Sequence, residues 1–302
     1  MYIALTIGVA LLLIYVIATY YLAKSIAHPK VVSLEQEIQW EKERQLWGNF
    51  DHYEKESYIV KGWEDYPLQV EFIKAATPSN RFIIITHGYT SNRYGAVKYL
   101  EVYRNLGFNT IIYDVRGHGA NESTAVSLGN FESHDLLKLI EDTYRRYGAF
   151  IELGLHGESM GSSISLSVLK FHPKIKFVVA DCGFSNLYDL IRELYAQRKA
   201  LLLLGGVNLM MYFFQKFNMK ETNPQAALKE NDVPILLIHG KNDRFILPHH
   251  SERLAQSTRG YYELHLIAHA THAGSRQKIG LGAYTQLVEQ FLARINSQTD
   301  YE

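Results

Sequence analysis

The sequence contains a single cysteine, Cys182, among its 302 residues. One cysteine rules out an intramolecular disulfide and a zinc site built from cysteines. Net charge is also absent, because 31 Lys and Arg residues balance 31 Asp and Glu residues. Proteins that bind nucleic acids usually carry a basic surplus or a basic patch. The charge balance therefore gives no indication of a nucleic-acid partner.

Internal repeats and low-complexity tracts are also missing from the sequence. Hydrophobic residues make up 47% and charged residues 21%, which is ordinary globular usage and argues against wholesale disorder, a collagen-like chain or a coiled coil. The length allows one large domain or two small ones. The composition therefore indicates a globular enzyme or binding domain.

Charge is missing altogether from Tyr2 to Ala23, a run rich in Ile, Leu, Val, Ala and Tyr. A helix of this length spans roughly the 30 Å hydrocarbon core of a bilayer. Tyr20 and Tyr21 would then lie at the level of the lipid headgroups. We therefore expect residues 1–24 to form a transmembrane anchor.

Two other interpretations of this run are a cleaved signal peptide and a buried core helix. Ser25 and Ala27 are the small residues that would precede a cleavage site. The segment before the apolar run has no Lys or Arg, however, and the run is long for a signal peptide. The transmembrane anchor is the favoured interpretation.

The distribution of basic residues predicts the orientation of this anchor. Basic residues follow the span and none precedes it: Lys24, Lys30, Lys42 and Arg44. The positive-inside rule therefore favours the cytoplasm for the C-terminal domain, and the outer face stays open as the alternative.

A linker is expected at residues 25–50. Pro29 ends the first helix, and Val31–Trp47 reads as a polar helix that Gly48 terminates. This helix either packs on the following domain as a spacer or lies on the membrane surface through Trp40 and Trp47.

Strands and helices alternate through the remaining domain, residues 51–302. The expected strands are Glu54–Gly62, Leu68–Ala75, Arg81–Thr86, Asn109–Tyr113, Phe150–Leu155, Phe177–Ala180, Pro234–Ile238 and Tyr262–Ile267. The expected helices are Tyr94–Leu106, Glu132–Tyr147, Gly161–Phe171, His249–Ser257 and Ala283–Ile295. This alternation predicts an α/β fold with a mostly parallel sheet and helices on both faces.

The motif G-x-S-x-G stands between an expected strand and an expected helix, at Gly157 to Gly161. A strand that passes into a helix through so tight a turn strains the serine backbone and lifts its hydroxyl above the sheet, and the glycines avoid collisions there. We expect Ser159 to be a nucleophile.

A serine nucleophile needs a base to take its proton and an acid to orient that base. In this arrangement the acid precedes the histidine along the chain. Asp243 follows the strand PILLIHG, and His272 follows the strand YYELHLI. We expect these two residues to complete a catalytic triad with Ser159.

Each of these assignments has an alternative nearby. His269 also follows the last strand and would otherwise be a packing residue at the strand end. Asp181 follows the strand FVVAD and is an alternative acid, or else caps the following helix. Asp243 is favoured because its strand adjoins the one that carries the histidine.

An oxyanion hole needs two backbone N–H groups that point toward the developing negative charge. Met160 directly follows the nucleophile and is expected to supply one of them. Tyr89, in the loop after the strand RFIIIT, is expected to supply the other.

The motifs HGYTSN, DVRGHG and GESMG, followed by the Asp243 loop and His272, resemble those of α/β-hydrolases in their order. With the hydrophobic N-terminus, they resemble membrane-attached serine-aminopeptidase-like or esterase-like hydrolases of Gram-positive bacteria. The resemblance covers about residues 51–296. It implies the α/β-hydrolase fold and hydrolysis of carboxylic esters or related acyl compounds without a metal or organic cofactor. It also implies structural roles for Asp114 and Arg116.

An insert at residues 185–232 separates two expected strands by far more than an ordinary connection. Its apolar residues include Leu201–Leu204 and Met210–Phe214. As helices at the edge of the sheet, they would cover Ser159 as a lid suited to an acyl or aromatic group. These side chains could instead pack the insert onto the domain, or contact the same bilayer as the anchor and collect lipid substrates.

These features predict a membrane-anchored serine hydrolase that cleaves small-molecule esters through an acyl-enzyme. An amide-cleaving, aminopeptidase-like enzyme is the nearest alternative. A non-catalytic binding module at the membrane is a third interpretation, disfavoured because all three triad residues are present.

Overall fold

A computed structural model describes residues 1–299 and contains one eight-stranded sheet in the order β1-β2-β4-β3-β5-β6-β7-β8. The strands are β1 (Lys55–Lys61), β2 (Pro67–Ile73), β3 (Arg81–Thr86), β4 (Asn109–Tyr113), β5 (Glu152–Glu158), β6 (Phe177–Asp181), β7 (Ile235–Gly240) and β8 (Tyr262–Ile267). Strand β2 pairs antiparallel with β1 and β4, and the other neighbours are parallel. The predicted mostly parallel sheet is confirmed.

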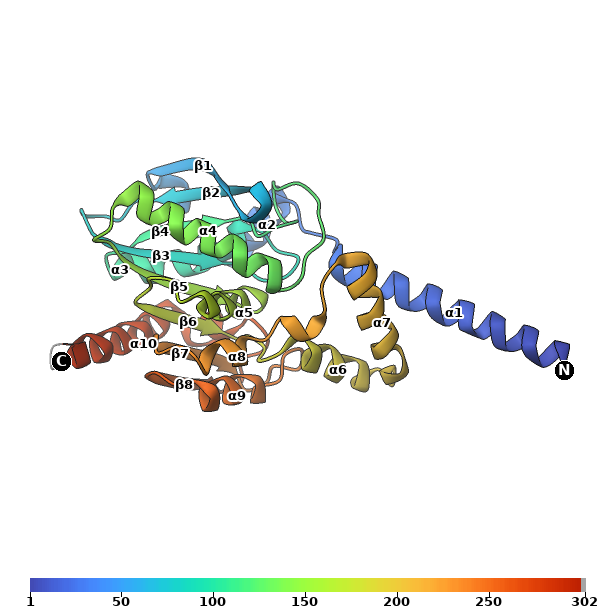
Figure 1. The fold of residues 1–302 in the computed structure, drawn as a ribbon. Helices are drawn as coiled ribbons and strands as arrows, with labels where there is room; N and C mark the ends of the chain where they lie inside the picture. The colour runs from blue at the N-terminus through green and yellow to red at the C-terminus, as the bar shows by residue number, and fades with distance from the viewer. Residues whose placement is uncertain (300–302) are drawn as a thin grey trace.

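Helices cover both faces of this sheet (Figure 1). They are α1 (Tyr2–Ala27), α2 (Leu34–Glu43), α3 (Leu100–Asn105), α4 (Asn130–Tyr147), α5 (Met160–Ser167), α6 (Leu187–Gln197), α7 (Leu204–Met210), α8 (Pro224–Leu228), α9 (His249–Ser257) and α10 (Ser275–Thr299). One face packs mainly against α4, α5, α8 and α9, and the other against α3 and α10. The continuous apolar runs of the central strands are explained by this burial on both sides.

Several helices differ from the sequence prediction at their starts; α3, for example, begins at Leu100 rather than Tyr94, after a 3₁₀ segment at Arg93–Tyr99. Helix α10 begins at Ser275 rather than Ala283, and it contains a kink at Gly280, where φ is +80°. The polar helix expected at Val31–Trp47 is the shorter α2, and Trp47 is buried against Phe50. Because Trp47 is buried in the domain, the interpretation that it lies on a membrane surface is wrong, and α2 packs on the domain.

Helix α1 points away from the domain along most of its length (Figure 1). Its buried residues are confined to the C-terminal part, at Thr19, Ala23 and Ala27. By length and composition the helix could cross a membrane or be a signal sequence. The buried part contacts α7 and the π-helical turn Met211–Gln215, both in the insert between β6 and β7.

The loop after β4 is held by two buried ionic contacts. Asp114 pairs with the Arg93 guanidinium and accepts hydrogen bonds from the backbone N–H groups of Arg93 at 2.8 Å and Ala120 at 2.9 Å. Arg116 donates twice to Asp135 of α4, at 2.7 and 2.8 Å, and both side chains are almost fully buried. The structural roles that the resemblance implied for Asp114 and Arg116 are confirmed.

Replacing Asp135 with alanine should destabilise the fold by about 3–5 kcal/mol, because it leaves the buried Arg116 charge without a partner. Denaturant unfolding in detergent would measure this change. Asp65→Ala is the control, since Asp65 pairs with Lys61 at 3.4 Å on the exposed surface and should leave stability essentially unchanged. Equal stability of the two variants would contradict the importance of the buried pair.

Candidate active site

Ser159 lies on a strained turn that joins β5 to α5. Its φ and ψ angles are 56° and −120°, in a region that non-glycine residues rarely occupy. A Cβ atom at Gly157 would lie 2.2 Å from the carbonyl oxygen of Gly161, and one at Gly161 would lie 2.1 Å from the carbonyl oxygen of Thr86. The two glycines therefore allow a turn that no larger residue would fit, as the motif predicts.

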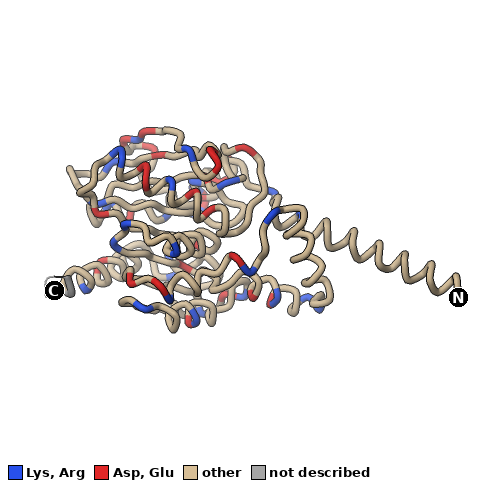
Figure 2. The backbone as a smooth tube through the Cα atoms, in the orientation of Figure 1, with Lys and Arg blue, Asp and Glu red and all other residues tan. Residues whose placement is uncertain are grey.

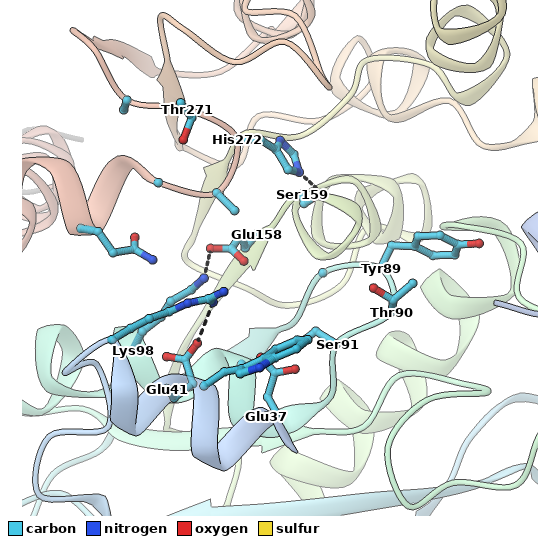
Figure 3. A pocket seen from close by; sticks show the side chains of 18 of the residues that line it. Glu37, Glu41, Tyr89, Thr90, Ser91, Lys98, Glu158, Ser159, Thr271 and His272 are labelled. Atoms are coloured by element: carbon cyan, nitrogen blue, oxygen red, sulfur yellow. Dashed lines mark hydrogen bonds and ion pairs between the residues drawn. The ribbon is translucent and has the colours of Figure 1, made fainter. Parts of the chain in front are cut away.

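The structure brings Ser159, His272 and Asp243 together at the carboxyl ends of three parallel strands. His272 Nε2 lies 2.9 Å from Ser159 Oγ, a hydrogen bond drawn in Figure 3. His272 Nδ1 lies 2.7 Å from Asp243 Oδ2. The three residues thus form one hydrogen-bonded chain, although they are far apart in the sequence.

The Asp243 carboxylate is buried but well supplied with hydrogen-bond donors. The backbone N–H groups of Phe245 and Ile246 donate to Oδ1 at 2.9 and 3.0 Å. Burial opposes ionisation of Asp243, but hydrogen bonds from His239 and His272 outweigh it and hold its pKa well below the usual range. Asp243 therefore remains an anion that can orient His272.

His239 is a neighbour of Asp243 that the sequence analysis missed. Its Nε2 atom lies 3.2 Å from Asp243 Oδ2, and its Nδ1 atom lies 2.6 Å from Ser251 Oγ. No signal distinguished this histidine, because it stands inside an apolar strand and finds its partners on a loop and on α9.

His269 and Asp181 are the alternatives to His272 and Asp243 in the predicted triad. Neither has the packing or capping role expected of it. His269 is exposed and lines a pocket, so its interpretation as a packing residue is wrong. Asp181 does not cap a helix but accepts hydrogen bonds from Ser275 and Tyr284, both at 3.1 Å. Burial raises the pKa of Asp181 to about 6. Asp181 is buried because α10 and Tyr99 pack over the end of β6.

Two amide groups beside Ser159 have no partner within residues 1–299. Neither Tyr89 N–H nor Met160 N–H donates to another described residue. The loop that carries Tyr89 passes close to the serine, since a Cβ atom at Gly88 would lie 3.5 Å from Ser159 Cβ. His87 holds this loop by accepting from Val115 N–H at 2.9 Å, and burial lowers its pKa to about 3, so the ring is neutral.

The Tyr89 side chain contributes more than the backbone role that the sequence suggests. Its hydroxyl donates to the carbonyl oxygen of Ile26 at 2.8 Å. This bond ties the last turn of α1 to the loop beside Ser159.

Two pockets of different character meet at Ser159. The larger, of about 670 Å³, is polar, and His272 lies at its rim. Its buried charged residues are Glu37, Glu41, Lys98 and Glu158 (Figure 3). The smaller, of about 140 Å³, is apolar and is lined by Leu128, Phe184, Leu190, Ile191, Leu194 and Ile246, among others. Three of these residues belong to α6 of the insert.

Two clusters within residues 1–299 place three potential metal ligands within 4.8 Å of one another. The first joins Cys182 to Asp243 and His272, but burial raises the pKa of the Cys182 thiol well above its usual value, and metals bind the thiolate. In the second, Glu193 accepts from His249 and His250 and thereby ties α6 to α9. Hydrogen bonds of Glu193 with both histidines account for the second cluster.

The chain is similar in sequence to two families of serine hydrolases. Residues 77–184 match the family described as serine aminopeptidase, S33. Residues 149–273 match the family described as serine hydrolase (FSH1). A relative from Bacillus subtilis, the uncharacterized protein YqkD, is 29% identical over 257 residues, which cover 83% of this chain and 84% of YqkD.

Solved structures show the same fold at low sequence identity. The Pyrococcus furiosus esterase Pf2001 is 19% identical, with a TM-score of 0.67, and the match covers 89% of this chain and 97% of the esterase. The Pyrococcus horikoshii acylaminoacyl peptidase is 17% identical, with a TM-score of 0.62, over 80% of this chain and 42% of the peptidase. The chain therefore has the α/β-hydrolase fold. Both family matches are to serine hydrolases and support hydrolase activity.

Proposed function

We propose that the protein is a serine esterase in which Ser159, His272 and Asp243 form the catalytic triad. The observation that carries the proposal is the continuous chain of hydrogen bonds from Ser159 Oγ through His272 to Asp243, at 2.9 and 2.7 Å. A serine beside a base that is itself oriented by an acid is the arrangement that activates a hydroxyl for attack on an acyl carbon.

In this mechanism Ser159 Oγ attacks the ester carbonyl while His272 Nε2 takes its proton. The Tyr89 and Met160 N–H groups stabilise the resulting oxyanion, and losing one such donor typically costs about 3 kcal/mol of transition-state stabilisation. His272 then gives the proton to the departing alcohol, which leaves an acyl-enzyme. Water attacks the acyl-enzyme with His272 again as the base, and the acid is released.

The two pockets suggest how the two parts of an ester are bound. The apolar pocket contains Met160 and Tyr89 but not His272, so we place the acyl group there. A pocket of about 140 Å³ is similar in size to an engineered cavity of about 150 Å³ that binds benzene. The larger pocket contains His272, which must protonate the leaving oxygen, so we place the alcohol there. The insert thus roofs the acyl pocket and acts as its lid.

An amide bond is the second candidate target. The name of the serine aminopeptidase family and the likeness to an acylaminoacyl peptidase favour it. The same triad cleaves both bonds, because the chemistry at the acyl carbon is shared.

We further propose that α1 anchors the protein in a membrane and that the catalytic domain faces the cytoplasm. The support is that α1 carries exposed apolar side chains along most of its length, and that Lys24 and Lys30 follow the span.

A fluorophosphonate probe should label the intact protein but not the Ser159→Ala variant. His272→Ala should lower kcat by at least about 10⁴-fold, because the serine then lacks its base. His52→Ala removes an exposed histidine outside both pockets and should retain most of the activity. Failure of the folded wild-type protein to react with the probe or with any ester would favour a non-catalytic binding module.

Hydrolysis of p-nitrophenyl esters should be fastest for acyl chains of about four to six carbons, since the apolar pocket is about the size that holds benzene. Leu190→Ala enlarges this pocket and should shift the optimum toward longer chains. Leu137→Ala, on α4 outside both pockets, is the matched control. The p-nitroanilide of the best acyl group should react more slowly than its ester. Faster cleavage of the anilide would instead support the amide-cleaving function.

A further inference from the structure

Helix α2 contributes a buried carboxylate to the larger pocket. Glu41 is only 1% exposed, yet it lines the pocket that contains Ser159 and His272. Figure 3 shows its side chain rising from α2 on the side of the pocket where Lys98 and Glu158 lie. A residue between the N-terminal helix and the first strand thus reaches the substrate site.

One oxygen of Glu41 has no hydrogen-bond partner in the described part of the chain. This atom is Oε2, and the nearest ion pair of the side chain joins Oε1 to Arg44 at 4.0 Å. A buried carboxylate without a partner is costly, so structures rarely retain one unless something binds there.

The charged groups around Glu41 do not supply the missing partner. Lys98 is engaged by Glu158 at 2.5 Å, and Glu37 adds a second buried carboxylate on the same helix. Arg276 of α10 also faces this region, but its Nε atom lacks a partner of its own. Three buried carboxylates and one buried lysine line the pocket, whereas Arg44 and Lys278, the other two cations that line it, are exposed, so the buried side chains carry an excess of negative charge. Consistent with this crowding, burial raises the pKa of Glu41 to about 7.

We propose that Glu41 binds a cationic hydrogen-bond donor, such as a protonated amine, on the alcohol part of the substrate. The proposal rests on the esterase function and names the class of leaving group. A protonated amine would donate to Oε2 and neutralise the carboxylate, and charged hydrogen bonds of this kind are among the strong ones. The ester would then place its acyl group in the apolar pocket and its amine on α2.

The test compares two butyrate esters of the same shape. The alcohol of the first is 2-(dimethylamino)ethanol, which is protonated at neutral pH, and that of the second is 3-methylbutanol, in which CH replaces the protonated nitrogen. Glu41→Gln should lower the ratio of the two kcat/KM values, charged over neutral, by about tenfold or more. Glu43→Gln alters an exposed carboxylate on the same helix and should keep the ratio of the wild type.

An unchanged ratio in Glu41→Gln would overturn the proposal, even if both rates fell together, since equal losses indicate a structural role. If the wild type hydrolysed both esters without preferring the charged one, the proposal would fail while the esterase function stood. If the folded wild type hydrolysed neither and did not react with a fluorophosphonate, both would fail.

The insert contacts α1 at a position that determines how close it lies to a membrane spanned by this helix. The 26 residues of α1 measure about 39 Å, and a span of the hydrocarbon core needs about 20 residues. The insert already contacts α1 at Tyr15, whose hydroxyl donates to the carbonyl oxygen of Leu202 at 3.0 Å. Only about 20 Å of α1 precedes this contact. A membrane-spanning α1 therefore brings the insert to the edge of the hydrocarbon core.

The surface of the insert suits that position. Six large apolar side chains are exposed on it, with Leu202 exposed by 89%: Leu201, Leu202, Leu209, Tyr212, Phe213 and Phe214. No charged residue occurs between Lys199 and Lys216. Tyr20 of α1 packs against Phe214 with ring centroids 5.2 Å apart, so this surface continues that of the helix. Figure 2 shows the same uncharged character along the protruding part of α1.

We infer that this surface, defined by the six side chains above, is buried in the membrane leaflet next to the catalytic domain. Exposed aromatic and leucine side chains on a short helix flanked by lysines are typical of segments that lie in the interface. The inference rests on the proposed anchor and adds a second contact with the bilayer.

Single cysteines labelled with the dye NBD can measure this depth, since the native Cys182 is fully buried. In vesicles containing lipids with a shallow doxyl quencher, labels at Leu202→Cys and Phe213→Cys should be quenched. A label at Phe150→Cys should not be, because this equally exposed side chain lies at the opposite end of β5 from Ser159.

A label at Leu12→Cys reports on the anchor itself. Quenching at Leu12 without quenching at Leu202 and Phe213 would overturn the second contact and leave the anchor intact. Absence of quenching at all of these positions would overturn both.

Discussion

The close approach of β5, α5 and the loop after β3 is the constraint on which the candidate active site depends. Gly157 and Gly161 allow backbone atoms to pack where a Cβ atom would lie little more than 2 Å from a carbonyl oxygen. This packing holds Ser159 in a strained conformation and brings the Tyr89 loop beside it. Strain of this kind persists only when the surrounding structure determines it fully, and here the buried central strands provide that support.

Much of this arrangement could be predicted from the sequence because it follows from local rules. Apolar runs predicted the central strands, and the glycine motif predicted the turn at Ser159. The order of the strands predicted that Asp243 and His272 lie at one edge of the sheet. The hydrogen bonds among these three residues agree with that placement. Their catalytic roles remain part of the proposed function.

The remaining features depend on contacts between distant elements, which no local pattern encodes. Helix α2 reads as a spacer, yet it forms a wall of the larger pocket through Glu37 and Glu41. Asp181 reads as an alternative acid or a cap of the following helix, yet its partners Tyr284 and Ser275 come from α10, about a hundred residues later. His239 reads as one more strand residue, although it supports Asp243. In each case the partner is supplied by tertiary packing rather than by sequence neighbours.

The hydroxyl of Tyr89 joins two parts of the molecule that would otherwise act separately. It holds the carbonyl oxygen of Ile26 in the last turn of α1, while the backbone of the same residue adjoins Ser159. Bilayers of different thickness change the tilt of a spanning helix. A tilt of α1 would therefore pull directly on the residue proposed to hold the oxyanion. With the proposed anchor and esterase activity, turnover would then depend on lipid chain length even for a substrate dissolved in water.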